Sequence, residues 1–72
     1  MKFAELPMNE GTGSVILTHS QASKIQCCGL CASNVQCAAA QFDRTKMECS
    51  LLDDRGFSAS INLSLVFLLP EV

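Results

Sequence analysis

The residues best suited to chemistry in this chain are its five cysteines. Four of them lie within eleven residues, in the stretch CCGLCASNVQC at 27–37, and the fifth is Cys49. Thiols at this density can bind a metal ion, take part in redox exchange or form structural disulfides. Each use demands a different arrangement of the elements that carry them.

A structural zinc site needs four thiolate or imidazole ligands, usually supplied as two close pairs. Cys28 and Cys31 form one C-x-x-C pair, but there is no second pair, because eleven residues separate Cys37 from Cys49. His19 is the only histidine, and we expect it to be an exposed residue before a helix. The spacing therefore argues against a metal site.

A thioredoxin-type redox site places its C-x-x-C at a helix N-terminus, where the helix dipole lowers the thiol pKa. In this chain Cys28-Gly-Leu-Cys31 falls in the middle of a predicted helix, and no βαβ pattern precedes it. No paired carboxylates or phosphate-binding glycine motif accompany it. We predict a protein that is not an enzyme and uses no cofactor, with a small cytosolic zinc-binding or thiol redox domain as the alternative.

Length and charge narrow the range of functions. Seventy-two residues make one domain, 1–72, whose core is small enough to need staples such as disulfides. The net charge is −2 without a basic patch, which argues against a nucleic-acid partner. The longest apolar-rich run, 61–69, is too short to span a bilayer. Glu5 and Pro7 interrupt any signal peptide at the N-terminus, so an extracellular chain would have a signal that was removed or lies upstream.

Short elements must position the cysteines. Ser20 and Ser23 are both candidate N-caps of a helix that runs to about residue 33, with Asn34 as a left-handed stop. Ser23 with Gln26 also fits a capping box. Cys27 and Cys31 share one face of this helix because they are four residues apart. Strands are predicted at 3–8, 14–18, 35–43, 47–54 and 61–69, with Pro70 ending the last one; 9–13 reads as a turn and 54–60 as a loop. Residues 1–13 are either this first strand and turn or a poorly ordered terminus. The pattern is α+β.

The segment SKIQCCGLCASNVQCAAAQFDRTKMECSLLDD, residues 23–54, resembles the PAN/apple family. The shared features are a helix with C-x3-C, five residues to a third cysteine, a strand with a small residue and an aromatic–acid end (Ala39, then Phe42-Asp43), and a closing strand from Lys46 to Leu52. The resemblance implies one helix cradled by a twisted antiparallel sheet of four to five short strands, stapled by disulfides. Ala40 departs from it, because the family usually has a large aromatic residue there.

The resemblance also implies the disulfide pairing: Cys27 with Cys49 and Cys31 with Cys37. The chain has no cysteine before 27 or after 49, so it is similar to the two-disulfide PAN type. Cys28 is then extra. It can be a free thiol, it can link two chains into a dimer, or it can replace Cys27 in the bridge from helix to strand.

PAN-like domains are extracellular or cell-surface recognition modules, so the resemblance implies binding of a protein or carbohydrate ligand, as part of a larger chain. We expect the ligand at the loops 9–13, 44–47 and 53–60, where Arg44, Lys46, Arg55 and Phe57 are the candidate contacts. Asn62-Leu63-Ser64 is an N-glycosylation sequon, although it falls inside the last predicted strand. A disulfide-rich secreted effector of unrelated fold is a further alternative.

Overall fold

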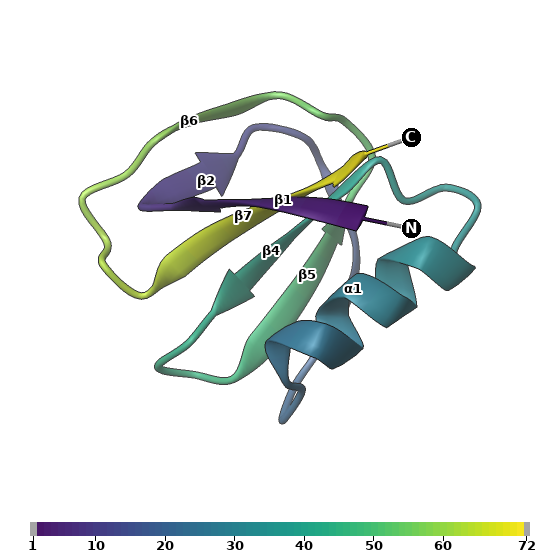
Figure 1. The fold of residues 1–72 in the computed structure, drawn as a ribbon, viewed down its shortest axis with the longest axis horizontal. Helices are drawn as coiled ribbons and strands as arrows, with labels where there is room; N and C mark the ends of the chain where they lie inside the picture. The colour runs from purple at the N-terminus through teal and green to yellow at the C-terminus, as the bar shows by residue number, and fades with distance from the viewer. Residues whose placement is uncertain (1, 72) are drawn as a thin grey trace.

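The computed structural model describes residues 2–71 and contains one helix, a five-stranded antiparallel sheet and a separate two-stranded ribbon (Figure 1). The elements, in chain order, are β1 (Lys2–Pro7), β2 (Asn9–Gly11), β3 (Val15–His19), α1 (Lys24–Ser33), β4 (Ala39–Asp43), β5 (Glu48–Leu52), β6 (Phe57–Ala59) and β7 (Leu65–Glu71). The predicted α+β class, with one helix packed on a disulfide-stapled antiparallel sheet, is confirmed.

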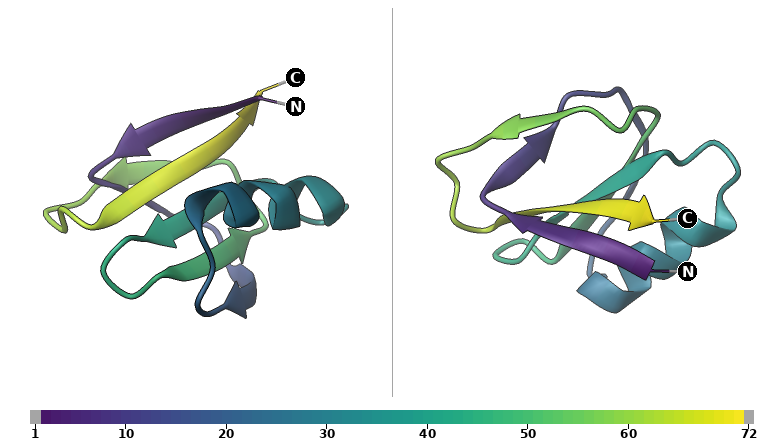
Figure 2. Two further views of the ribbon diagram at one scale, coloured as in Figure 1. Left: turned by 60° about the horizontal axis from the view of Figure 1, so that its bottom comes forward. Right: turned by 45° about the horizontal axis from the view of Figure 1, so that its top comes forward.

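The large sheet has the strand order β1-β7-β4-β5-β3, so the last strand of the chain lies between the first strand and the central hairpin. β1 pairs along its whole length with β7, from Lys2 opposite Glu71 to Pro7 opposite Val66. The two ends of the described chain are consequently neighbours at one side of the molecule (Figure 2).

The helix begins as its sequence predicts. The Ser23 hydroxyl accepts a hydrogen bond from the Gln26 backbone N–H, and the Gln26 side chain accepts one from the Ser23 N–H, which completes the capping box. The left-handed stop at Asn34 is wrong: its backbone is extended, with φ −105° and ψ 114°. The Asn34 side chain instead accepts the N–H of Gln36 at 2.9 Å, so it directs the next turn by a different mechanism.

Two small cores lie on opposite faces of the sheet, because successive side chains of a strand alternate between its faces. The helix-side core gathers the buried residues Ala22, Cys27, Cys31, Ala40, Phe42, Cys49, Leu51, Val66 and Leu68. Ala40, where an aromatic residue was expected, is fully buried there. The opposite core is built on Ala39, Leu52 and Phe67.

The ribbon of β2 and β6 covers this second core. Asn9 pairs with Ala59 and Gly11 with Phe57, so the predictions of a plain turn at 9–13 and a loop at 54–60 are wrong at these positions. The Gly11 N–H donates to the Gln41 side-chain oxygen at 2.8 Å, and the Phe57 ring lies against Phe67 with centroids 5.0 Å apart. Both contacts attach the ribbon to the sheet.

Further boundaries differ from the sequence prediction. β4 starts at Ala39 rather than at 35. The last strand starts at Leu65 rather than at 61, and it continues through Pro70 to Glu71. Pro70 is tolerated because β7 shares only residues up to Leu68 with β4, so the strand is paired on one side beyond that point. Residues 2–11 form β1 and β2, and Met1 lies outside the described residues.

Candidate recognition surface

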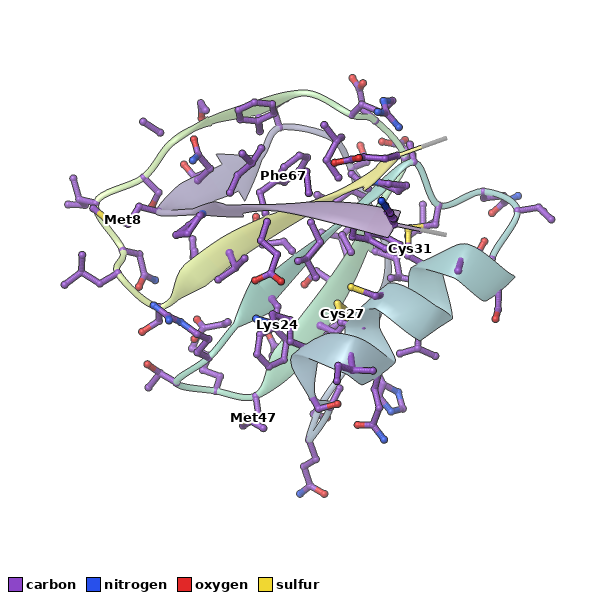
Figure 3. All side chains as sticks on the ribbon, in the orientation of Figure 1. Met8, Lys24, Cys27, Cys31, Met47 and Phe67 are labelled. Carbon is purple, nitrogen blue, oxygen red and sulfur yellow. A yellow bond between two sulfur atoms is a disulfide. The ribbon has the colours of Figure 1, made fainter. Side chains whose placement is uncertain are left out.

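Two disulfides fix the helix against the sheet. The Cys27–Cys49 bridge spans 5.5 Å between Cα atoms and joins the first half of α1 to β5, with both residues fully buried. The Cys31–Cys37 bridge, with 5.3 Å between Cα atoms, joins the end of α1 to the turn before β4. These are the pairings that the resemblance implied, and they tie the helix at two of its turns (Figure 3).

Cys28 is the remaining cysteine, and it is free and partly buried. It lies near the ion pair between Lys24 Nζ and Glu5 Oε1, which are 2.7 Å apart. Burial raises the pKa of the Cys28 thiol and the Glu5 carboxylate raises it further, while Lys24 acts in the opposite direction. The thiol therefore stays protonated at neutral pH, which makes it a poor nucleophile and a poor metal ligand.

The described residues offer no enclosed chemical site. Within 2–71, no group of three or more histidine, cysteine or acidic side chains converges as a metal would require, and His19 lies exposed on β3 opposite Cys49. No pocket is found among the same residues. The single helix of this part of the chain is too short to cross a membrane.

Two of the three predicted binding loops form one continuous surface. The Thr12 N–H donates to the Gly56 carbonyl at 3.0 Å, and the Ser14 N–H donates to the Asp53 carboxylate at 2.8 Å. Together with the β2–β6 pairing, these bonds join residues 9–14 to residues 53–60. We call this surface the recognition ribbon.

The recognition ribbon presents one aromatic ring and a small set of charges. Phe57 is 45% exposed, because one side of its ring rests on Phe67 while the other faces solvent. Arg55 is its one basic residue, against the acidic residues Glu10, Asp53 and Asp54. The ribbon therefore combines a held aromatic platform with hydrogen-bonding side chains of both charges.

The third predicted loop, residues 44–47, belongs to a different surface. The Asp43 carboxylate accepts the N–H groups of Thr45 and Lys46, which closes the turn between β4 and β5. The Arg44 guanidinium donates to the Leu63 carbonyl, so part of its bonding capacity is used within the fold. Lys46 is exposed. The structure thus separates Arg44 and Lys46 from Arg55 and Phe57.

Sequence reasoning missed the pairing that builds the recognition ribbon. Residues 9–11 and 57–59 are far apart in the chain, and each forms a strand of only three residues. The available signal was Gly11: a side chain at this position would collide with Leu52 and approach Phe67, and a glycine in a strand often marks such a close approach.

Comparison with known proteins agrees with this architecture. A family model described as "PAN domain" matches residues 2–66. That match extends beyond the segment 23–54 and includes β1, the ribbon and the start of β7. No curated protein matches the chain.

Proposed function

The chain belongs to the PAN domain family, and on this premise we propose that residues 1–72 form a non-catalytic recognition domain within a larger secreted or cell-surface protein. PAN domains are in general extracellular modules that bind proteins or carbohydrates. The observation that carries the proposal is the family match over nearly the whole domain, together with two buried or partly buried disulfides that staple helix to sheet. Disulfides of this kind persist in oxidising, extracellular settings.

We further propose that the recognition ribbon makes the contact with the ligand. Its support is structural: the ribbon is anchored on the sheet by Gly11 and Phe57, and it exposes an aromatic ring beside Arg55. Aromatic and arginine side chains held on a rigid base are typical energetic anchors of interfaces. Because no pocket is present in the described residues, a protein surface or an extended glycan fits better than a small molecule that must be enclosed.

Binding to cell surfaces tests the proposal and separates the two ligand classes. The oxidised chain is labelled and applied to intact cells, to cells treated with a protease, and to cells treated with glycosidases. Loss of binding after protease alone indicates a protein ligand, and loss after glycosidase indicates a carbohydrate. A panel of immobilised glycans provides the direct readout for the second case.

Variants on both surfaces locate the contact. Phe57→Ala is expected to weaken binding at least tenfold, whereas Val35→Ala, which alters a fully exposed apolar residue outside the ribbon, is expected to leave it unchanged. Arg55→Ala tests the charge beside the ring, and Arg44→Ala with Lys46→Ala tests the other surface. If Arg44→Ala with Lys46→Ala abolishes binding while Phe57→Ala and Arg55→Ala leave it intact, the ligand contacts the 44–47 turn and the ribbon assignment is wrong.

A further inference from the structure

The sequon Asn62-Leu63-Ser64 lies in an exposed turn rather than in the strand that its sequence predicts. β6 ends at Ala59 and β7 begins at Leu65, so the three residues fall in the connection between them. Asn62 is exposed. The sequon was predicted to fall inside a strand, where glycosylation is disfavoured. Its position in a turn is instead the setting expected of glycosylated asparagines, which lie in surface loops.

The turn holds the asparagine side chain with its amide nitrogen free. Asn62 Oδ1 accepts the Ser64 N–H at 2.9 Å, and the Asn62 N–H donates to the Ser60 hydroxyl at 3.1 Å. Within residues 2–71, Asn62 Nδ2 makes no hydrogen bond. The nitrogen to which a glycan would be joined is therefore not engaged within the described residues, while the oxygen of the same amide fixes the side chain.

Exposed apolar residues flank this asparagine along the chain. Ile61 is 98% exposed and Leu63 is 65% exposed. Met8 lies beside them, because its N–H donates to the Leu65 carbonyl and its carbonyl accepts the Ser60 N–H, both at 2.8 Å. Met8 is itself 42% exposed and lies at the end of the molecule away from the helix (Figure 3). We call Met8, Ile61 and Leu63 the apolar tip.

Three exposed apolar side chains on adjacent backbone segments leave apolar surface in water, and such surface favours aggregation when nothing covers it. The apolar tip has the sequon at its centre, with Asn62 between Ile61 and Leu63. We propose that Asn62 carries an N-linked glycan that shields the apolar tip. This inference rests on the proposed function for its premise that the chain enters the secretory route.

The modification is a group transfer onto the free amide nitrogen. The donor is an oligosaccharide joined through N-acetylglucosamine to a polyprenyl pyrophosphate. A bond forms between Asn62 Nδ2 and C1 of the N-acetylglucosamine, and the bond from C1 to the pyrophosphate oxygen breaks. Nδ2 loses one proton, which leaves with the polyprenyl pyrophosphate, and no oxidation or reduction takes place.

A glycan at this position also restricts where a partner can bind. The 44–47 turn lies against the sequon, because Arg44 donates to the Leu63 carbonyl and the Thr45 and Ser64 hydroxyls are hydrogen-bonded. The part of the recognition ribbon around Arg55 lies before β6, whereas Asn62 lies after it. The glycan thus covers the turn that carries Arg44 and Lys46 and leaves the Arg55 end of the ribbon open.

Secretion of the full chain behind a cleavable signal sequence, in cells that perform N-glycosylation, tests the attachment. Intact mass is measured before and after treatment with peptide N-glycosidase, on both the lysate and the medium, so that poor secretion does not hide the result. One enzyme-sensitive glycan is expected. It should disappear in Asn62→Gln and Ser64→Ala, and persist in Ser64→Thr, which keeps the sequon and the hydroxyl, and in Asn34→Gln, which alters an asparagine outside any sequon.

Shielding is tested on the same proteins. Unglycosylated Asn62→Gln is expected to be retained longer on a hydrophobic column and to self-associate more than the glycosylated chain. Adding Ile61→Ser and Leu63→Ser to this variant should reverse both effects. Equal retention of the glycosylated and unglycosylated chains would overturn the shielding role.

The outcomes separate this inference from the proposed function. An oxidised chain with two disulfides that carries no glycan in either fraction overturns the inference and leaves the proposed function standing. Five free thiols in the secretory fraction contradict the proposed function, and the glycan measurement on that same sample still decides the modification by itself.

Discussion

At the scale of single residues, neighbouring cysteines of the same helix have opposite chemical fates. Cys27 is fully buried against β5 and bonded to Cys49, whereas Cys28 is turned toward β1 and the Glu5–Lys24 ion pair. Successive helical residues point about 100° apart, so only one of the two can face β5. The helix geometry that directs Cys27 toward Cys49 therefore directs Cys28 away from it.

The raised thiol pKa of Cys28 predicts slow alkylation. Iodoacetamide reacts with thiolate, so the rate in the folded, oxidised chain should reach its plateau at a higher pH than in the denaturant-unfolded chain. Glu5→Gln removes a carboxylate that raises this pKa, and its profile should move to lower pH. Glu10→Gln, which alters a carboxylate that does not affect Cys28, serves as the control.

The same shift links folding to pH. Because folding raises the pKa of Cys28, the thiol's contribution to stability is complete below the unfolded pKa and declines as the pH rises toward the folded one.

Intact mass after alkylation should show one modified thiol without reductant and five with it. A doubled mass that reductant returns to the monomer would show that Cys28 links two chains and would contradict the prediction that it stays a free thiol.

Two glycines should respond to the same substitution with opposite signs. A Cβ at Gly11 would collide with Leu52 under the ribbon, so Gly11→Ala should destabilise the fold, by about 1–3 kcal/mol on the scale of overpacked cores. Gly29 is exposed on α1 with nothing near its added Cβ, so Gly29→Ala should stabilise it by about 0.5–1 kcal/mol. Denaturant unfolding measures both, and a neutral Gly11→Ala would mean that the ribbon does not pack closely on Leu52.

At the scale of elements, the sequence predicted those helix and strand positions that depend on residues close together in the chain. The capping box at Ser23 and Gln26 located the helix start, and short apolar runs on either side of a polar turn located β4 and β5. The start of β7 was misplaced because Ile61 and Leu63 are apolar but exposed, so the run looks longer than the buried strand. The ribbon was missed because two three-residue strands gain their stability from the sheet beneath them.

The two disulfides should contribute unequally. The Cys27–Cys49 bridge closes 22 residues and the Cys31–Cys37 bridge closes 6, for which loop-closure entropy gives about 3 and about 2 kcal/mol. Replacing Cys27 and Cys49 with alanine should therefore lower the free energy of unfolding more than replacing Cys31 and Cys37. Chemical denaturation of the two double variants checks the order, and the reverse order would show that the bridge beside β4 restrains the unfolded chain more than its length predicts.

At the scale of the whole molecule, the resemblance carried by residues 23–54 describes only part of a folding unit. That segment supplies α1, β4 and β5, but the sheet places β7 between β4 and β1. Val66, Phe67 and Leu68 of β7 are buried and contribute to the cores on both faces. No residue spacing in the sequence predicts that the last strand lies between β1 and β4, since this arrangement depends on pairing between residues far apart in the chain.

A peptide of residues 23–54 should therefore fail to fold, although it holds both disulfide pairs. Without β7, the helix-side core loses Val66 and Leu68, and the other core loses Phe67, which supports the ribbon. The open edge of β4 would also expose its unpaired backbone groups. After oxidation in a glutathione buffer, the peptide should give a mixture of disulfide isomers and no cooperative unfolding by circular dichroism, whereas residues 1–72 should give the two native bridges and one transition. A peptide that regains the native pairing and unfolds cooperatively would show that helix, hairpin and disulfides suffice, and that β1, β7 and the ribbon are additions to an independent core.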